Sequence, residues 1–348
     1  IMPDQTTDLF LALTPHAVLD AVEAAGLRTN PLSYPLNSFE NRVYEVELED
    51  RSRIVAKFYR PGRWSKEQIL EEHSFLADLA ADEVPLCGVT TMPSGETLAQ
   101  TKGIHYCIFE RKGGRAPDEL DDALVQRLGM LAARIHNTGA KCQSSFRNKL
   151  NSEVYVRNEL DYLKANNTIP SHLASRFEKA ALSIADIADD RMNGVETIRI
   201  HGDFHKGNVL ARDNVLHVLD FDDMVVGPPV QDLWMLLPGR DPYTIRQRDL
   251  FIRAYEQFRD FDRSTLRLIE PLRGLRIVHF IGWLARRWHD PIFPATWPHF
   301  GTESFWDQET RDLEDLLSHI QKEERVDSPT TATDAEALTN KDFFWDLE

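Results

Sequence analysis

Residues 201–223 read HGDFHKGNVLARDNVLHVLDFDD, with five aspartates and three histidines around the apolar runs 209–211 and 215–219. Carboxylates this close together repel one another unless a positive charge lies among them. A metal ion or a basic side chain usually supplies that charge. The stretch is therefore the first candidate for a ligand site.

The same stretch predicts a short hairpin. Gly202 and Gly207 make a long helix improbable, and two apolar runs joined by the polar turn 212–214 are typical of paired strands. A hairpin places its two flanks side by side. We therefore expect Asp203 and Asn208, on the first flank, to lie near Asp220 on the second.

These residue types suit phosphoryl transfer. Asn208 and Asp220 offer two oxygen ligands and leave room for water and phosphate oxygens, as Mg²⁺ prefers. Asp203, left off the metal, would orient a hydroxyl and accept its proton. The spacing from Asp203 to Asn208 equals that of a kinase catalytic loop, and DFD at 220–222 stands where kinases have Asp-Phe-Gly. Asp222 and Asp223 are expected either to share in the site or to bind backbone amides.

Such a site also needs a lysine on a strand and a glutamate on the next helix. The hairpin predicted over 42–59 supplies Lys57, which strand alternation places opposite Ala56 and Phe58. On the helix predicted from Ser65, Glu72 shares a face with apolar residues, whereas Glu71 shares one with acids. We therefore expect Glu72 to pair with Lys57 and Glu71 to point to water.

Composition excludes several classes of protein. The 348 residues carry a net charge of −16, which argues against a nucleic-acid partner. Three widely spaced cysteines indicate neither a disulfide framework nor a zinc site. No apolar run reaches the roughly 18 residues of a membrane span, and no secretory signal is visible. We expect a cytoplasmic protein.

The order of predicted elements indicates an α+β fold with two lobes. Apart from the helix over 14–26, strands and the helix from Ser65 occupy an N-lobe over 1–109, which includes a strand at 105–109. A mostly helical C-lobe over 110–325 follows, and 326–348 is expected to be a flexible acidic tail with FFWDL as a possible docking patch. A cleft between the lobes is the expected site. The helices expected in the C-lobe span 119–138, 152–165, 171–192, 229–237, 244–258, 264–288 and 303–324.

Several motifs together carry a resemblance. HGDFHKGN, LDFDD and GPPVQDLWMLL resemble the aminoglycoside phosphotransferase and choline kinase group, which has a protein-kinase-like bilobal fold. PLNSFENRVYEVE, VAKFYRPGRWSKEQILEEH and WLARRWHDPIFP more closely resemble the stress response kinase A family of bacterial Ser/Thr protein kinases. The resemblance covers roughly residues 14–320.

The resemblance implies an ATP- and Mg²⁺-dependent kinase that phosphorylates Ser and Thr of proteins in a stress response, with possible autophosphorylation. It implies a protein partner, no nucleic acid or membrane partner, and action as a monomer. Asp203 and Asp220 would be catalytic, with Asn208 and Asp220 as metal ligands. Lys57, held by Glu72, would contact ATP. The other implied residues are Ser38 in the phosphate-covering loop, Phe109, Glu110 and Arg111 in the adenine hinge, and His201, His205 and Asp232 in support of the catalytic loop.

Two departures from ordinary protein kinases leave the acceptor open. The loop NSFENR has no glycine, so a Gly-rich approach to phosphate is excluded, and His205 stands where many Ser/Thr kinases have a lysine. A small alcohol such as choline, homoserine or an aminosugar is therefore the alternative acceptor. A regulator that binds a nucleotide without catalysis ranks third. Its sign would be the loss of one of the four residues required for the chemistry, and all are present: Lys57, Asp203, Asn208 and Asp220.

Two further patterns favour plain structural interpretations. His201 and His205 have the spacing of zinc ligands on a helix, but the glycines argue against a helix there. The tryptophans between 279 and 306 follow helical spacing, which favours core packing over a substrate-pocket wall. The neighbouring Arg286 and Arg287 are expected to pair with local carboxylates.

Overall fold

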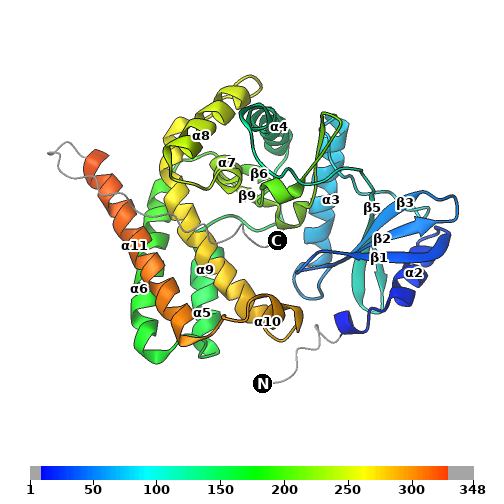
Figure 1. The fold of residues 1–348 in the computed structure, drawn as a ribbon, viewed down its shortest axis with the longest axis horizontal. Helices are drawn as coiled ribbons and strands as arrows, with labels where there is room; N and C mark the ends of the chain where they lie inside the picture. The colour runs from blue at the N-terminus through cyan, green and yellow to red at the C-terminus, as the bar shows by residue number, and fades with distance from the viewer. Residues whose placement is uncertain (1–8, 328–348) are drawn as a thin grey trace. The chain divides into compact units, whose positions relative to one another are not determined.

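The computed structural model describes residues 9–327, which form two compact units (Figure 1). The sheet unit comprises the chain up to Asp121 together with Arg134–Arg147 and His201–Met224. The helical unit comprises Asp122–Ala133, Asn148–Ile200 and the chain from Val225. This division differs from the expected lobes 1–109 and 110–325, because the stretch 201–223 packs with the sheet. Most of the expected tail, 328–348, lies outside the described residues.

The sheet unit holds a five-stranded antiparallel sheet in the order β1-β2-β3-β5-β4. Its strands are β1 (Thr29–Leu36), β2 (Arg42–Leu48), β3 (Arg53–Phe58), β4 (Ala99–Thr101) and β5 (Ile104–Glu110). The predicted hairpin over 42–59 and the strand at 105–109 are confirmed as β2–β3 and β5. Sequence analysis missed β1, whose two prolines weaken a strand signal. Proline is tolerated there because β1 lies at the sheet edge.

Two helices with clear end signals flank this sheet. Thr14 caps α2 (Pro15–Ala24) by accepting a hydrogen bond from the Ala17 N–H, and the chain leaves the helix through Gly26 at φ +93°. A capping box of Ser65 and Gln68 opens α3 (Lys66–Ala81). Both helices confirm their sequence signals.

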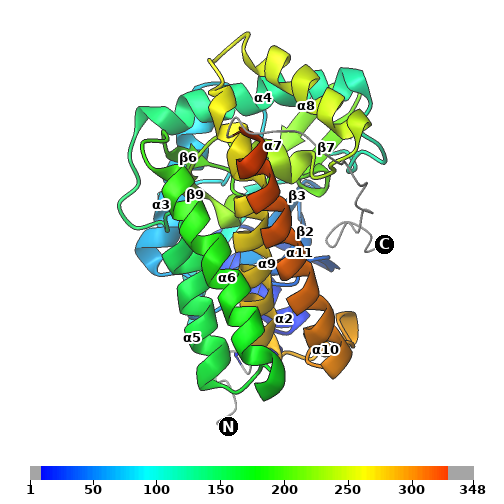
Figure 2. The same cartoon turned by 90° about the vertical axis from the view of Figure 1, so that its left-hand side faces the viewer.

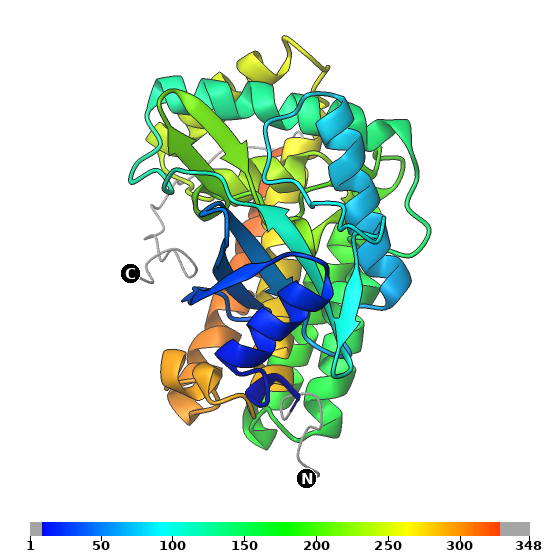
Figure 3. The same cartoon turned by 90° about the vertical axis from the view of Figure 1, so that its right-hand side faces the viewer.

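The two helices cover opposite faces of the sheet, as Figures 1 and 3 show. Val18 and Val22 of α2 join one apolar cluster with Ala56 and Phe58. On the other face, Ile69 of α3 packs in a second cluster with Tyr59 and Cys107, the strand partner of Lys57. Strand alternation therefore places Lys57 on the α3 face, as its sequence pattern predicted.

A second, smaller hairpin belongs to the same unit. β7 (Val209–Arg212) pairs with β8 (Val215–Val218) through the left-handed residues Asp213 and Asn214. This confirms the predicted hairpin. Bridges from Leu86 to Val218 and from Arg115 to Ala211 attach it to the segments before and after β4–β5. The stretch 201–223 is thereby fixed to the sheet unit.

The helical unit is built mainly from long helices. α5 (Asn158–Ala165), α6 (Ser171–Met192), α9 (Ile269–Arg287) and α11 (Glu303–Asp327) run side by side (Figure 2). The first turn of the helix expected over 152–165 is a π-helix, and that of the helix expected over 264–288 is a 3-10 helix. The remaining elements are α4 (Asp122–Lys141), which passes from this unit into the sheet unit, β6 (Ile198–Ile200), β9 (Val225–Gly227), α7 (Val230–Leu236), α8 (Pro242–Tyr255) and α10 (Ile292–Thr296). Between residues 9 and 327, no helix combines the length and apolar character needed to cross a membrane.

The core packing expected of the tryptophans between 279 and 306 is confirmed for Trp306, whereas Trp283, Trp288 and Trp297 are half-buried. Trp306 is fully buried and meets the Phe177 ring edge-on. Trp283 contacts Phe293 and Trp297, and all three lie within the helical unit. Arg286 pairs with Glu159 at 2.9 Å, so its partner is a local carboxylate.

Candidate active site

The two flanks of the β7–β8 hairpin meet at its open end. The Leu219 N–H donates to the Asn208 carbonyl at 3.0 Å, which places Asp220 next to Asn208. Asp220 adopts φ 60° and ψ 66°, a left-handed conformation that is uncommon for residues other than glycine. Such strain is often retained at functional sites because the surrounding structure holds it. The predicted convergence of the two metal-ligand candidates is therefore what the hairpin produces.

Asp203 lies on the loop before β7 and is directed by Asn208. The Asn208 side-chain Nδ2 donates to the Asp203 carbonyl at 2.9 Å and lies 3.3 Å from Asp203 Oδ2. This arrangement uses the amide nitrogen of Asn208 and leaves its Oδ1 for another ligand. It also holds the Asp203 carboxylate in one orientation.

His201 joins the two flanks from beneath and is fully buried. Its Nδ1 accepts a hydrogen bond from the Asp203 N–H at 3.2 Å. The other ring nitrogen, Nε2, therefore carries the proton and donates to the Leu219 carbonyl at 3.0 Å. The His201 ring therefore links the Asp203 loop to the flank that carries Asp220, which is consistent with the supporting role predicted for it.

His205 contacts Asp203 from its own loop. Its Nδ1 accepts from the Gly207 N–H at 3.0 Å, so the neutral ring carries its proton on Nε2. That nitrogen lies 3.4 Å from Asp203 Oδ2. A Cβ on Gly207 would come within 2.7 Å of the His205 ring, so glycine is needed for this approach. His205 therefore steadies the carboxylate where many protein kinases have a lysine.

We expect His205→Leu to lower kcat about fivefold, since the loss of one polar contact that orients Asp203 is worth roughly 1 kcal/mol. Steady-state kinetics at saturating ATP measures this. His205→Gln restores an N–H donor and should recover most of the rate. A leucine variant as fast as the parent protein would remove His205 from the site.

Lys57 lies among three carboxylates. Its Nζ is 3.1 Å from Asp222 Oδ1, 3.3 Å from Asp220 Oδ1 and 3.4 Å from Glu72 Oε1. Burial lowers the pKa of Lys57, but the three carboxylates outweigh burial and hold it well above its usual value. The ammonium is therefore charged at any physiological pH and fixed at the edge of the site.

The choice between the two glutamates of α3 is half confirmed. Glu72 is fully buried and pairs with Lys57, as predicted. The prediction that Glu71 points to water is wrong. Its carboxylate accepts hydrogen bonds from the N–H groups of Ser145, Phe146 and Arg147. Helical periodicity indicated the outer face of α3 but carried no sign of the loop that covers it.

Sequence analysis missed a buried arginine that joins α3 to the Asp220 flank. The Arg147 guanidinium donates to Glu72 Oε2 at 3.0 Å, to the Asp222 carbonyl at 2.6 Å and to the Gln68 carbonyl at 2.8 Å. Its guanidinium also stacks over the Trp64 ring at 4.3 Å. Arg147 thus fixes the distance between the Lys57–Glu72 pair and the loop that carries Asp220.

A second missed arginine, Arg63, binds the same loop from the turn between β3 and α3. It forms ion pairs with Asp222 and Asp223, and its Nε lies 3.7 Å from Glu40 in the loop between β1 and β2. Lys57, Arg63 and Arg147 hold the pKa of the buried Asp222 well below its usual value, against the effect of burial. Asp222 and Asp223 therefore form ion pairs with basic side chains.

We call Arg63 and Arg147 the arginine clamp. Together with Lys57, it contributes three positive charges against Glu72, Asp220, Asp222 and Asp223. One negative charge therefore remains, and Asp220 has the most exposed side chain of the four, at 48%. This local excess favours a bound cation at Asp220.

A cavity of about 330 Å³ opens beside Lys57 and Asp220 within the sheet unit. This volume is at the lower end of the range for small-molecule sites. Its apolar walls come from both the sheet and the hairpin, and its polar end holds Lys57 and Asp220, as a nucleotide with a flat base and charged phosphates would require. The predicted residues Ser38, Phe109, Glu110 and Arg111 also line it.

The loop around Ser38 is held by side chains. The Arg60 Nε donates to the Glu40 carbonyl at 3.0 Å, and the Asn41 side chain accepts from the Arg60 N–H at 3.2 Å. These contacts anchor the loop to the end of β3 without glycine. Ser38 is left at the cavity wall, where the prediction placed it.

The hinge segment is partly committed to other contacts. The Glu110 N–H donates to the Gly88 carbonyl at 3.0 Å, and the Arg111 guanidinium binds Glu45 at 3.0 Å. The Arg111 side chain is therefore bound to Glu45 of β2. Recognition of a base would depend on backbone groups of this segment other than the Glu110 N–H. Phe109 lines the cavity, and the centre of its ring is 5.8 Å from Lys57 Nζ.

The donor set fits a divalent cation held by few protein ligands. Across the described part of the chain, no group of three or more His, Cys, Asp or Glu side chains is arranged to hold a metal. Asn208 Oδ1 and the Asp220 carboxylate are two oxygen donors, which suits Mg²⁺ completed by phosphate oxygens and water. Asp232, the last predicted residue, is buried in α7 of the helical unit.

Comparison with known proteins identifies relatives of this chain. The family model described as the phosphotransferase enzyme family matches residues 34–269. Stress response kinase A of Escherichia coli (strain K12) is 40% identical over 304 residues, covering 86% of this chain and 92% of the relative. The serine/threonine protein kinase RdoA of Salmonella typhimurium has the same identity and coverage.

Solved structures share the fold at low sequence identity. Amicoumacin kinase in complex with AMP-PNP, Ca²⁺ and Ami aligns with a TM-score of 0.67 and 21% identity, covering 87% of this chain and 92% of that one. A microcompartment-associated aminopropanol kinase aligns with a TM-score of 0.62 and 17% identity, covering 88% and 98%. The protein-kinase-like fold expected from sequence is therefore confirmed.

Proposed function

The chain belongs to the phosphotransferase enzyme family, and we propose that within it the protein is an ATP- and Mg²⁺-dependent kinase acting on Ser and Thr hydroxyls of proteins. The observation that carries the proposal is the arrangement of Asp203, Asn208 and Asp220 around the end of one hairpin, beside the buried Lys57–Glu72 pair. Each part of a phosphoryl-transfer site has a residue in this arrangement.

Asp203 orients the acceptor hydroxyl and takes its proton as the oxygen attacks the γ-phosphorus. The bond between the γ-phosphorus and the bridging oxygen breaks, ADP leaves, and the proton passes from Asp203 to solvent. His205 and Asn208 keep the carboxylate aimed during this step. Lys57 holds the nucleotide phosphates, and Glu72 with the arginine clamp holds Lys57.

Asn208 and Asp220 would hold the Mg²⁺ ion, which when bound neutralises charge on the β- and γ-phosphates. The left-handed backbone at Asp220 aims its side chain toward the cavity that Lys57 also lines. Since the Lys57 ammonium already contacts Asp220, the residue is shared between the lysine and the metal.

The acceptor class is supported by the two relatives at 40% identity, one of which is named a serine/threonine protein kinase. Their names also support a role in a stress response. The small-alcohol acceptor stays the alternative, since the fold alone is shared with kinases that are named for small molecules.

The acceptor experiment uses full-length protein, Mg²⁺ and γ-labelled ATP with a Ser/Thr-rich protein. A panel of choline, homoserine and aminosugars is tested separately under the same conditions. We expect label on the protein, or on the enzyme's own Ser and Thr. Label on a small alcohol alone would reject the protein-kinase assignment while keeping the phosphotransferase chemistry.

A further inference from the structure

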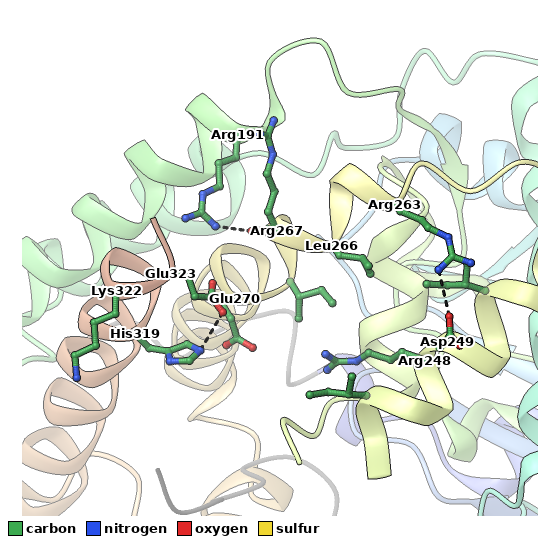
Figure 4. Close-up of a pocket in the computed structure, with 13 residues that line it drawn as sticks. Arg191, Arg248, Asp249, Arg263, Leu266, Arg267, Glu270, His319, Lys322 and Glu323 are labelled. Atoms are coloured by element: carbon green, nitrogen blue, oxygen red, sulfur yellow. Dashed lines mark hydrogen bonds and ion pairs between the residues drawn. The ribbon is translucent and has the colours of Figure 1, made fainter. Parts of the chain in front are cut away.

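The helical unit contains a large open pocket that shares no lining residue with the stretch 201–223. It has a volume of about 1050 Å³ and is bordered by α8, the start of α9, the end of α6 and the last turns of α11. Figure 4 shows Arg248 of α8 extending into this space, with Lys322 and His319 on α11. We call it the basic pocket.

Its charge contrasts with that of the whole chain. Five Arg and Lys side chains line the pocket against three carboxylates, a balance of +2, whereas the chain carries −16. The lining carboxylates are already engaged: Asp249 with Arg263, Glu323 with His319, and Glu270 with Arg240 and Arg273, which lie outside the lining. The positive surplus is therefore not cancelled within the pocket.

Three of the lining cations are available for a ligand. Among side chains of residues 9–323, Arg248, Arg267 and Lys322 form no ion pair with a carboxylate. Arg248 donates instead to the Leu237 and Gly239 carbonyls. Burial, then the neighbouring Arg273, lowers its pKa to about 10. An anion placed here would relieve repulsion between arginines as well as gain ion pairs.

The pocket also has an apolar component. Ile245, Ile252, Leu266 and Ile269 lie between the charged side chains. Ile245 is 55% exposed, which is unusual for a large aliphatic residue beside a concave surface. A fitting ligand therefore combines acidic groups with large apolar ones, and a simple inorganic anion would leave the apolar part open.

The chain's own C-terminal segment has this composition. Residues 328–348 contain five acids and one lysine, hence a charge of −4, and they end in KDFFWDLE. This octapeptide contains two phenylalanines, a tryptophan and a leucine together with three acids. The segment follows α11 directly, whose Lys322 and Glu323 already line the pocket. Twenty-one residues span up to about 70 Å when extended, so reach imposes no limit.

We propose that residues 342–348 bind in the basic pocket of the same molecule. The acids Asp342, Asp346 and Glu348 complement the charge of Arg248, Arg267 and Lys322, and the aromatic residues of the segment complement the apolar isoleucines and Leu266. The segment would thereby cover an apolar surface that is otherwise open to water. This inference is independent of the proposed acceptor.

Hydrogen–deuterium exchange of the full-length protein tests the proposal. Amides of 342–348 should exchange at least about tenfold more slowly than in a synthetic peptide of residues 328–348. The double variant Arg267→Glu/Lys322→Glu changes two exposed side chains of the pocket rim and should restore the peptide rate. Raising NaCl to about 0.5 M should reduce the protection in the parent protein, because salt screens exposed charges.

A matched control separates docking from net charge. Lys66→Glu/Lys179→Glu makes the same charge change at two exposed lysines outside the pocket and should leave the protection in place. Exchange at the peptide rate in the parent protein would overturn the proposal, as would equal loss in both double variants. Protection that appears only as the mass doubles with concentration would assign the segment to a second copy and reject the intramolecular form.

Discussion

Asp203→Asn is expected to lower kcat by about 10³-fold while ATP affinity changes less than about threefold. A positioned general base contributes roughly 10²–10⁴ in rate, and asparagine keeps the shape of Asp203 but cannot take the proton. Asn208 and His205 would still hold the side chain in place. The loss should therefore fall on the chemical step and not on folding or nucleotide binding.

Stopped-time transfer assays and calorimetric titration with a non-hydrolysable ATP analogue measure the two quantities separately. Asp213→Asn is the matched control, because Asp213 lies in the same stretch, in the β7–β8 turn, with an 85% exposed side chain. Asparagine tolerates its left-handed backbone, so this variant should behave as the parent protein. Normal turnover by Asp203→Asn would refute the role of the residue.

Arg147→Met should destabilise the protein by about 3–5 kcal/mol, the usual cost of removing one partner from a buried ion pair. Methionine keeps an unbranched apolar side chain but removes the donor to the Asp222 carbonyl and one of the two cations that pair with the fully buried Glu72. The lost charge also removes one of the cations that hold the Asp222 loop. Activity should fall as well, since Lys57 depends on Glu72 and Asp222 for its position.

Thermal unfolding followed by circular dichroism should show a midpoint lower by roughly 10 °C. Arg147→Lys should rescue little, because a single ammonium cannot reproduce contacts made by a planar guanidinium to three acceptors. The control is Arg115→Met, which removes an 83% exposed arginine paired with an exposed aspartate. Exposed pairs of this kind contribute about 0–1 kcal/mol. Equal midpoints for the Arg147 and Arg115 variants would contradict the clamp.

Local patterns in the sequence were sufficient for the centre of the site. The β7–β8 hairpin follows from two apolar runs around a turn, and its register brings Asn208 next to Asp220. Strand alternation gave the face of the sheet on which Lys57 lies, and helical periodicity chose Glu72 over Glu71. These signals work because backbone geometry, and not distant packing, decides which way the side chains point.

The arginine clamp has no comparable signal. Arg147 contacts Asp222, which lies 75 residues further along the chain, and Arg63 contacts the same residue across 159. Arginine is usually a surface residue, so its burial depends on partners that only the tertiary fold brings together. The same reason explains Glu71, whose outward direction on α3 was correct but whose loop partner was invisible.

The proposed kinase activity toward Ser and Thr of proteins can be measured by counting ADP and transferred phosphate in one reaction. Full-length protein, Mg²⁺, γ-labelled ATP and a Ser/Thr-rich protein are incubated, and the acceptor is hydrolysed in acid to identify the labelled amino acid. We expect phosphoserine or phosphothreonine in amounts equal to ADP. In Asp203→Asn, we expect at least about a 100-fold loss of both the ADP and the phosphorylated amino acid. Labelled product that persists in Asp203→Asn, or ADP formed without any labelled Ser or Thr, would contradict the proposed activity.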